Sequence, residues 1–322
     1  MNRARLAGIV SRAAGNAPAE IVAIEPLRGG AVRRHWRVDA TVAGEPRSFV
    51  LRADGQTKLG FGLELGAEFA LLRTLAEAGI AVPPPVLYAD DASILDGPFH
   101  LTEFLPGSAD PALLAAVPTN DALAVRLGRE LAALHRLRPP SAALPFLTDP
   151  LSEYCTLLDR IGETRPIAEW AMRWLAQNAP EPLPPALCHG DFRTGNYLVA
   201  DGTLVAILDW EFAHWGDADA DLAWFCARFW RFGQDRREAG GIAARETFLA
   251  GYEALAGRRV DPARLRYWAV MAALKWLVIA LLQRDRYLRG GERSLDLALT
   301  GRRAAECEYE MLRLMDCDAR SA

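Results

Sequence analysis

The sequence predicts an α+β protein in which a smaller, strand-rich N-terminal part precedes a larger, mostly helical part. Two observations predict this division. Up to about residue 105, short runs of alternating and β-branched residues are separated by Gly and Pro turns, which is typical of strands. From residue 110 onward, apolar residues recur mostly at helical spacing, interrupted by one hairpin signal at Asp201-Gly202.

The N-terminal part is expected to contain several strands and one main helix. An amphipathic pattern over 3–14 predicts a short helix before the first strand. Leu65–Glu77 has apolar residues at helical spacing and stops before Gly79, which predicts the main helix. The expected strands are 21–27, 35–42, 48–52, 86–88 and a strand beginning at 99.

The C-terminal part is expected to consist of helices and one hairpin. Asn120 or Asp121 can cap a helix that runs to about Leu137. Two apolar runs flank Asp201-Gly202, so antiparallel pairing should place Asn196, which precedes the first run, beside Asp209, which follows the second. The expected strands of this hairpin are 197–199 and 204–208, and the further helices are 152–164, 167–178, 222–232, 241–256, 262–288 and 292–315.

Composition narrows the class of protein. A chain of 322 residues with 51% hydrophobic residues can form two domains with sizeable cores. The net charge of −4 argues against a nucleic-acid partner, because such partners select a basic surface. Five scattered cysteines without C-x-x-C spacing indicate reduced thiols. With no secretory signal, and with the apolar stretch 267–282 interrupted by Lys275, we expect a cytoplasmic protein without a membrane span, either monomer or homodimer.

Three polar residues around the hairpin carry the functional signal. Asp191 lies in His189-Gly190-Asp191, Asn196 follows five residues later, and Asp209 ends the hairpin. Phosphoryl transfer needs a carboxylate that orients a hydroxyl and takes its proton, and a divalent metal on the phosphates. Mg²⁺ prefers oxygen ligands such as carboxylates and amide carbonyls. Each aspartate alone can be a turn or capping residue, but the three together favour this chemistry.

The stretches HGDFRTGN and LDWE resemble the catalytic and metal loops of the aminoglycoside phosphotransferase / choline kinase family. They are most similar to a bacterial HGDFRxGN branch, including domains related to those fused to acyl-CoA dehydrogenases. The resemblance implies a protein-kinase-like two-lobe fold, with an antiparallel sheet and one main helix in an N-lobe (1–105) and a helical C-lobe (106–322). It also implies that Asp191 is the catalytic base and that Asn196 and Asp209 bind Mg²⁺.

The same resemblance implies where ATP would bind. The third strand of such folds carries a lysine that holds the phosphates and pairs with a glutamate of the following helix. Here Arg52 takes that position, with Glu68 as its expected partner, and Arg and Lys are not interchangeable. Lys58 is the local alternative.

Two further nucleotide contacts are expected from the N-lobe. The Gly29-Gly30 turn can direct backbone N–H groups to phosphates, although the full G-x-G-x-x-G pattern is missing. By the same resemblance, the segment 101–107 is the hinge and would contact adenine through the backbone of Glu103 and Leu105. The Pro-Gly that follows marks the domain boundary.

Support residues are expected around the catalytic loop. By resemblance, His189 holds this loop through hydrogen bonds and Asp221, at the start of helix 222–232, braces it. Cys188-His189 also suggests a zinc site, but no second ligand pair lies nearby in the sequence. His135 is expected to be a packed residue at a helix end.

The acceptor is left open among three kinds of small molecule. A hydroxy acid or hydroxyacyl compound would suit the arginines, an amino alcohol such as choline would suit an aromatic cage, and an aminoglycoside-like sugar would need a strongly acidic pocket. Glu211 could assist a second metal, face the acceptor or lie on the surface. The candidate acceptor residues are Arg193, Glu211, Trp215 and Arg228, with Trp224, Trp230 and Arg231 as further possibilities.

The leading expectation is an ATP- and Mg²⁺-dependent phosphotransferase that moves the γ-phosphoryl group to a hydroxyl of a small molecule. The alternative is a nucleotide-binding module of the same fold with weak or no activity. The alternative is favoured by Arg52 in place of lysine and by the incomplete glycine motif at Gly29-Gly30. The joint presence of Asp191, Asn196 and Asp209 favours the enzyme, because a binding module has no chemical need for all three.

Overall fold

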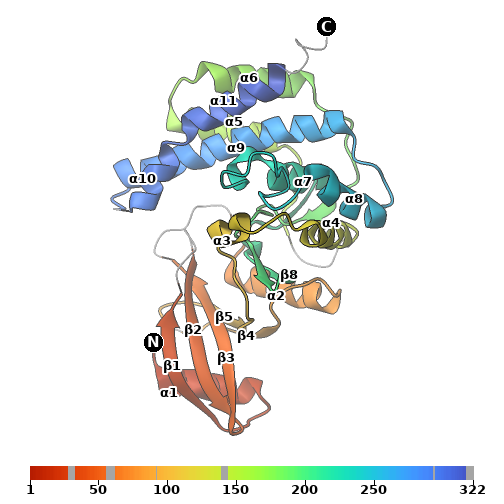
Figure 1. Cartoon of the computed structure of the whole chain (residues 1–322). Coiled ribbons are helices and arrows are strands. Elements are labelled where there is room, and N and C mark those ends of the chain that lie inside the picture. Colours follow the sequence, from red (N-terminus) through yellow and green to blue (C-terminus); the bar gives the residue numbers. More distant parts are fainter. Residues whose placement is uncertain (28–32, 56–61, 92, 139–143, 293, 317–322) are drawn as a thin grey trace. The chain divides into compact units, whose positions relative to one another are not determined.

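The computed structural model describes residues 1–27, 33–55, 62–91, 93–138, 144–292 and 294–316, and within it the chain forms two compact units (Figure 1). The first unit comprises Met1–Asp110, Leu137–Leu144 and Gly195–Ala213. The second unit comprises Pro111–Arg136, Pro145–Thr194 and His214–Ala322. The predicted hairpin and metal loop therefore belong to the same unit as the N-terminal strands.

The first unit is built on a five-stranded antiparallel sheet. Helix α1 (Arg3–Ala13) packs against one face of it, and Leu6 and Val10 of this helix join the apolar core there. The strands lie in the order β1 (Ala19–Pro26), β2 (Arg33–Val42), β3 (Glu45–Asp54), β5 (Phe99–Glu103) and β4 (Pro85–Ala89). Every expected strand is present: β1 begins two residues earlier and ends one residue earlier than predicted, and β2, β3 and β4 are extended by one to three residues. The main helix α2 (Leu65–Glu77) has the predicted bounds.

Alternation along β3 separates an apolar face of the sheet from a polar one. Phe49, Leu51 and Ala53 belong to the core that α1 covers. Successive side chains of a strand point to opposite faces, so Arg52 points to the other face. There its guanidinium meets Glu68 of α2 at 3.2 Å, which confirms the predicted pairing of these two residues.

The predicted Asp-Gly hairpin is confirmed. Strands β7 (Tyr197–Ala200) and β8 (Thr203–Ile207) pair with Tyr197 opposite Ile207. Asp201 and Gly202 both have positive φ, 49° and 74°, as a two-residue hairpin turn of this hand requires. The backbone N–H of Leu208 donates to the carbonyl of Asn196 at 2.8 Å, so Asn196 lies beside the residue that precedes Asp209.

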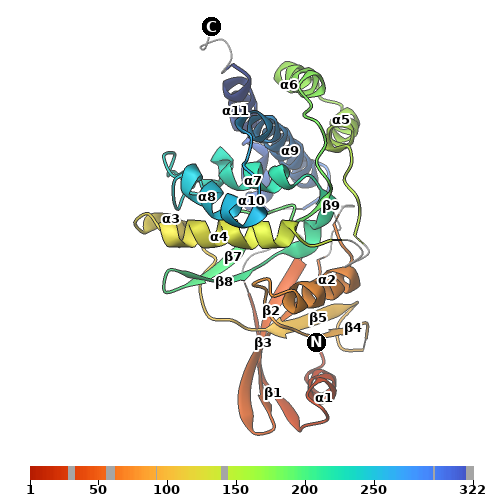
Figure 2. The same ribbon diagram turned by 90° about the vertical axis from the view of Figure 1, so that its right-hand side faces the viewer.

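The second unit is organised around the long helix α9 (Pro262–Leu288). Figures 1 and 2 both show α11 (Ala304–Met315) lying along it. The other helices that contact it are α5 (Pro150–Ile161), α6 (Pro166–Gln177), α7 (Ala218–Cys226) and α10 (Leu295–Gly301). Among the described residues, α9 is the one helix long and apolar enough to cross a membrane. Its most apolar window is 61% buried inside the structure, as is usual for a core helix.

A second pair of helices, α4 (Asp121–His135) and α8 (Arg245–Ala256), packs backbone to backbone. A Cβ added to Gly128 would lie 2.3 Å from the carbonyl oxygen of Phe248, so only glycine fits at this crossing. The cap that starts α4 is Asn120, whose side chain accepts from the N–H of Leu123, and α4 fixes His135 inside the unit.

Several element predictions were wrong in detail. The helix expected over 222–232 starts at Ala218, because Asp217 and not Asp221 provides the cap, and it ends at Cys226 before a short 3₁₀ turn, η2 (Arg228–Trp230). The helix expected over 292–315 is two helices, α10 and α11. Helix α3 (Pro111–Ala116) and the paired strands β6 (Ala186–Cys188) and β9 (His214–Gly216) were not predicted, because elements of three to six residues show too little periodicity.

Candidate functional site

A buried cluster of opposite charges lies on the polar face of the first unit's sheet. Arg52 is at its centre, with Nη1 3.2 Å from Glu68 Oε1, and Nη2 2.5 Å from Asp209 Oδ1 and 3.6 Å from Glu211 Oε2. Arg33 of β2 donates from Nε to Glu211 Oε2 at 3.1 Å and also pairs with Asp54. The expected metal ligand Asp209 and the expected phosphate ligand Arg52 are thus brought together by an ion pair.

Negative charge exceeds positive charge in this cluster. Four carboxylates pair with two guanidinium groups. Burial, and then the neighbouring charge of Asp209, raise the pKa of Glu211 to about 7. Burial also raises the pKa of Glu68. A cation added beside Asp209 and Glu211 would relieve this repulsion, because it favours the ionised form of both carboxylates.

Several buried polar atoms of the cluster have no hydrogen-bond partner within the described part of the chain. They are Arg52 Nε, Glu68 Oε2 and both ring nitrogens of His100. His100 is opposite Arg52 on β5, and burial together with the charge of Arg52 lowers its pKa to about 3, so the ring is neutral. Buried polar groups are normally satisfied, and the orphaned N–H of Arg52 therefore fits a polar ligand such as a phosphate oxygen.

The backbone around Asp209 is unusual. Asp209 has φ 65°, a left-handed conformation that non-glycine residues seldom adopt, and it directly precedes the 3₁₀ turn η1 (Trp210–Phe212) that carries Glu211. Such conformations concentrate at functional sites, where the surrounding structure holds them. Glu211 is only 5% exposed, so its interpretation as a surface carboxylate was wrong.

The remaining nucleotide candidates are placed only in part. The N–H of Glu103 donates to the carbonyl of Pro84 at 2.9 Å, its carboxylate pairs with Arg47, and Leu105 follows the end of β5. Gly29, Gly30 and Lys58 lie outside the described residues.

In the second unit, Asp221 braces the loop that carries Asp191. Its Oδ2 accepts from the backbone N–H of His189 at 2.7 Å and its Oδ1 accepts from that of Gly190 at 3.0 Å. His189 is fully buried, and its Nδ1 accepts from the N–H of Asp191 at 3.1 Å. These hydrogen bonds fix the backbone that leads into Asp191 without using its carboxylate.

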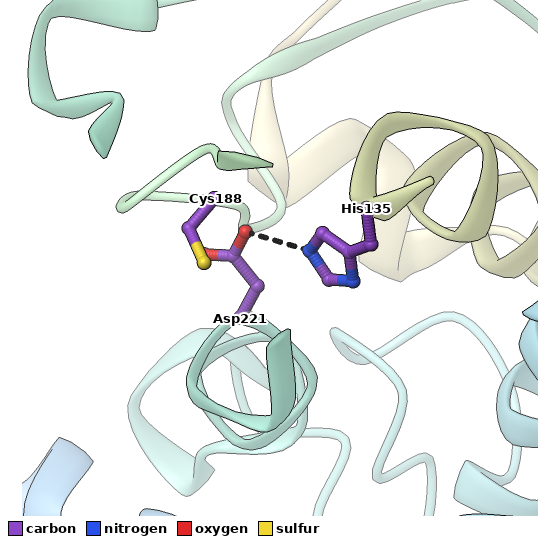
Figure 3. A group of neighbouring side chains, drawn as sticks. All are labelled: His135, Cys188 and Asp221. Carbon is purple, nitrogen blue, oxygen red and sulfur yellow. Dashed lines mark hydrogen bonds and ion pairs between the residues drawn. The ribbon is translucent and has the colours of Figure 1, made fainter. Parts of the chain in front are cut away.

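Asp221 lies in a cluster with His135 and Cys188 (Figure 3). Burial alone would raise the pKa of Asp221, but the hydrogen bond and charge of His135, whose Nε2 lies 3.3 Å away, hold it at about 2. Burial and the nearby charge of Asp221 raise the pKa of the Cys188 thiol well above its usual value. Since both Asp221 oxygens accept backbone N–H groups, Asp221 serves as a brace. Among the described residues, the group close enough to share a metal ion contains Cys188 together with His135 and Asp221, and not His189.

Asp191 is held by two side-chain donors. Its Oδ1 accepts from the indole N–H of Trp224 at 2.8 Å, and Arg193 Nε lies 3.1 Å from its Oδ2. The carboxylate is 13% exposed. Its oxygens are thereby oriented by α7 and by the loop itself.

Sequence reasoning missed Lys275. Its ammonium, on α9, donates to the carbonyl oxygen of Gly190 at 2.5 Å and lies 4.3 Å from the ring centroid of Trp224. Burial lowers its pKa, while the charges of Asp191 and Asp221 oppose that shift. The available signal was its rarity, because it is one of two lysines in the chain and it interrupts an apolar helix.

Comparison with known proteins identifies the family of this chain. The profile of the phosphotransferase enzyme family matches residues 23–268, which is most of the chain. The chain belongs to this family. Among solved structures, a candidate aminoglycoside phosphotransferase from Ralstonia eutropha matches with a TM-score of 0.73 at 19% identity, covering 95% of this chain and 96% of that one.

Other solved neighbours of this phosphotransferase confirm the predicted protein-kinase-like fold. A choline/ethanolamine kinase family protein from Mesorhizobium loti has a TM-score of 0.65 at 20% identity, covering 90% of this chain and 88% of that one. The GDP complex of aminoglycoside 2'-phosphotransferase-IIIa has a TM-score of 0.64 at 17% identity, covering 99% and 100%.

Curated relatives are longer proteins. Acyl-CoA dehydrogenase family member 11 of Rattus norvegicus is 28% identical over 262 residues, covering 74% of this chain and 33% of the relative. Acyl-CoA dehydrogenase family member 10 of Mus musculus is 29% identical over 177 residues, covering 51% and 16%. The phosphotransferase chain therefore spans about a third or less of the length of these relatives.

The acceptor candidates of this phosphotransferase are dispersed. Arg193 contacts Asp191. Trp215 is 1% exposed and stacks on Phe146, Arg228 pairs with Asp235 at 2.8 Å, and Glu211 belongs to the first unit's cluster. A pocket of about 40 Å³ lies beside the loop that carries Asp191 and is lined in part by Gly190, Asp221, Trp224, Trp268 and Lys275. It has room for only a few water molecules.

Proposed function

We propose that this protein is an ATP- and Mg²⁺-dependent kinase that transfers the γ-phosphoryl group to a hydroxyl of a small molecule. The observation that carries the proposal is the fixed carboxylate of Asp191. It lies on a loop whose backbone is braced by Asp221 and whose side chain is oriented by Trp224 and Arg193. A carboxylate held in this way is suited to orient a hydroxyl and accept its proton.

The first unit's cluster supports the metal and nucleotide part of the proposal. Asp209, Glu211 and the amide carbonyl of Asn196 are oxygen donors of the kind that Mg²⁺ takes. When bound, Mg²⁺ would neutralise charge on the β- and γ-phosphates. Arg52, held by Glu68 and with an unpartnered buried N–H, would bind phosphate oxygens. The main chain of Glu103 and Leu105 would contact the purine base.

Asp191 would act on the acceptor alone. Each carboxylate oxygen has two lone pairs, so it can accept the acceptor hydroxyl in addition to the bonds from Trp224 and Arg193. These two donors hold the carboxylate in one orientation until the hydroxyl proton is transferred to it. Orienting the hydroxyl oxygen toward the γ-phosphorus is the larger part of its contribution, because the transition state is loose.

Charges around Asp191 favour an anionic acceptor, such as a hydroxy acid or hydroxyacyl compound, over choline or an aminoglycoside. The ring of Trp224 faces the Lys275 ammonium, and the ring of Trp230 faces the Arg193 guanidinium at 4.7 Å. Two of the aromatic faces considered for a quaternary ammonium therefore already hold cations of the chain itself. A second cation would be repelled, whereas a carboxylate or phosphate would be attracted.

The second candidate function is nucleotide binding with weak or no transfer. Arg52 favours it, because the guanidinium lies 2.5 Å from Asp209 and so competes with Mg²⁺ for an expected ligand.

With either function, we propose that the protein works in the reducing cytoplasm, since the four described cysteines are free thiols. The oligomeric state is proposed as monomer or homodimer.

Phosphoryl turnover distinguishes the two functions. Mg²⁺-ATP would be incubated with a panel of anionic, cationic and neutral hydroxyl compounds, and new phosphate esters followed by ³¹P NMR. The kinase proposal expects ester formation, with the anionic compounds fastest, and its loss in Asp191→Asn. Nucleotide binding without any Asp191-dependent ester formation or ATP hydrolysis would contradict the kinase and support the binding module.

A further inference from the structure

A buried ammonium stands directly behind the loop that carries the proposed base. Lys275 lies in the middle of α9, and its neighbours Leu274 and Leu277 are fully buried in the apolar core of the second unit. Burying a charge costs free energy of desolvation unless it is paired or hydrogen-bonded, so an apolar residue here would destabilise the fold less. The presence of lysine at this position therefore needs a compensating role.

We infer that Lys275 is a positioning residue for Asp191 and that it acts through two of its neighbours. This inference rests on the proposed phosphotransfer. The first route is the carbonyl oxygen of Gly190, the residue before Asp191, to which the ammonium donates at 2.5 Å. The second route is the indole of Trp224, which lies under the ammonium and donates its own N–H to Asp191 Oδ1 at 2.8 Å.

The two routes act on different degrees of freedom of Asp191. The hydrogen bond from Lys275 to the Gly190 carbonyl fixes the peptide plane between Gly190 and Asp191. The preceding peptide plane is fixed separately, because the N–H of Gly190 donates to Asp221. The ring of Trp224 fixes the carboxylate, because a cation over an indole face holds the ring and polarises its N–H. Arg193, in contrast, contacts the carboxylate directly. Lys275 therefore adjusts the base without touching it or the substrate.

A charge-keeping and a charge-removing variant test the inference. Lys275→Met has a similar length without charge, Lys275→Arg keeps the charge, and Arg284→Met removes another cation of α9, one that pairs with Glu163 at 2.7 Å. The assay is Mg²⁺-ATP hydrolysis with water as acceptor, with binding of a non-hydrolysable ATP analogue measured in parallel.

We expect Lys275→Met to lower kcat by about 10–100-fold, a part of the ~10²–10⁴-fold that a general base supplies. Lys275→Arg should retain several-fold more activity than Lys275→Met, Arg284→Met should match the wild type, and the nucleotide Kd should not change in any of them. A Lys275→Met enzyme with wild-type kcat, or one whose loss Arg284→Met reproduces, would overturn the inference while leaving the kinase proposal intact.

A second measurement does not depend on turnover. Hydrogen exchange of the Trp224 indole N–H, assigned by NMR through its disappearance in Trp224→Phe, reports the hydrogen bond to Asp191. Faster exchange in Lys275→Met but not in Arg284→Met would support positioning, and unchanged exchange would overturn it. The exchange could change as expected while the wild type shows no Asp191-dependent ATP hydrolysis. That result would contradict the proposed kinase function, and Lys275 would then have no role in catalysis although it orders Trp224.

Discussion

The two units of this chain differ in the charge balance of their polar clusters. In the first unit, Arg33 and Arg52 face four carboxylates, and burial beside Asp209 raises the pKa of Glu211 to about 7. In the second unit, the two carboxylates of Asp191 and Asp221 lie near the two cations Arg193 and Lys275, so the negative charge has no such excess. From this difference we propose that the first unit receives a divalent cation and that the second holds one base in a fixed orientation toward an anionic acceptor.

The largest expected effect comes from removing the base. Asp191→Asn should lower kcat by about 10²–10⁴-fold with nucleotide Kd nearly unchanged, because Asp191 acts on the acceptor and not on ATP. The control is Asp201→Asn, which changes a nearby aspartate in the hairpin turn. Steady-state kinetics measure kcat and calorimetry measures nucleotide Kd. An equal loss of nucleotide binding would contradict the assignment of the base to the second unit and of the nucleotide to the first.

Arg52 should matter for ATP and not for the acceptor. Arg52→Ala removes phosphate contacts and leaves Glu68 buried without its partner, so nucleotide Kd should rise by about 10–100-fold. Stability should fall by about 3–5 kcal/mol in chemical denaturation. The comparison variant is Lys58→Ala, the alternative lysine, which should change little. The reverse outcome would show that Lys58 and not Arg52 serves the phosphates.

The raised pKa of Glu211 makes the first unit pH-dependent. Its folded-state pKa of about 7 exceeds the ordinary glutamate pKa of about 4.5, so the folded state binds more protons between these values. Without Mg²⁺, the contribution of Glu211 to the free energy of unfolding should therefore fall as pH rises from about 4.5 to about 7. Urea unfolding of the wild type and Glu211→Gln across this range measures it.

Mg²⁺ should act on the same carboxylate. Because the metal binds the ionised form, apparent Mg²⁺ affinity should rise through pH 7 in the wild type and much less in Glu211→Gln. An identical pH dependence in both proteins would mean that Glu211 does not carry the excess charge of the cluster.

The smallest effect is expected at the hinge. Glu103→Ala removes a carboxylate that pairs with the half-exposed Arg47, and such surface pairs contribute at most about 1 kcal/mol. The proposed adenine contact is main-chain, so nucleotide Kd should change less than about 2-fold. A much larger loss in calorimetry would show that the side chain itself contacts the nucleotide.

Local patterns predicted the parts of the site that depend on neighbours in sequence. The Asp-Gly turn predicted the hairpin that sets Asn196 beside the segment of Asp209. The Arg52–Glu68 pair was predicted by the family resemblance and not by a local pattern. Lys275 could not be found in this way, because its role depends on α9 meeting a loop 85 residues earlier.

The same limit explains the errors around the second unit. Asp217, Asp219 and Asp221 are equally plausible helix caps in sequence, and only packing decides that Asp217 caps α7 while Asp221 turns inward to the loop. Trp215 and Arg228 were proposed as acceptor contacts from the sequence. In the structure Trp215 is buried against Phe146, a long-range contact, and Arg228 pairs with Asp235, a contact that depends on the local loop conformation. Neither contact can be read from a sequence pattern. Glu211 was ambiguous because its partner Arg33 lies 178 residues away.

The most direct test of the division of labour is calorimetric titration with a non-hydrolysable ATP analogue, with and without Mg²⁺, on the wild type, Asp209→Asn and Asp191→Asn. The account predicts Mg²⁺-dependent binding that is weakened in Asp209→Asn and retained in Asp191→Asn. Binding that ignores Mg²⁺ and Asp209, or that is lost with Asp191, would contradict the assignment of metal and nucleotide to the first unit and of the base to the second.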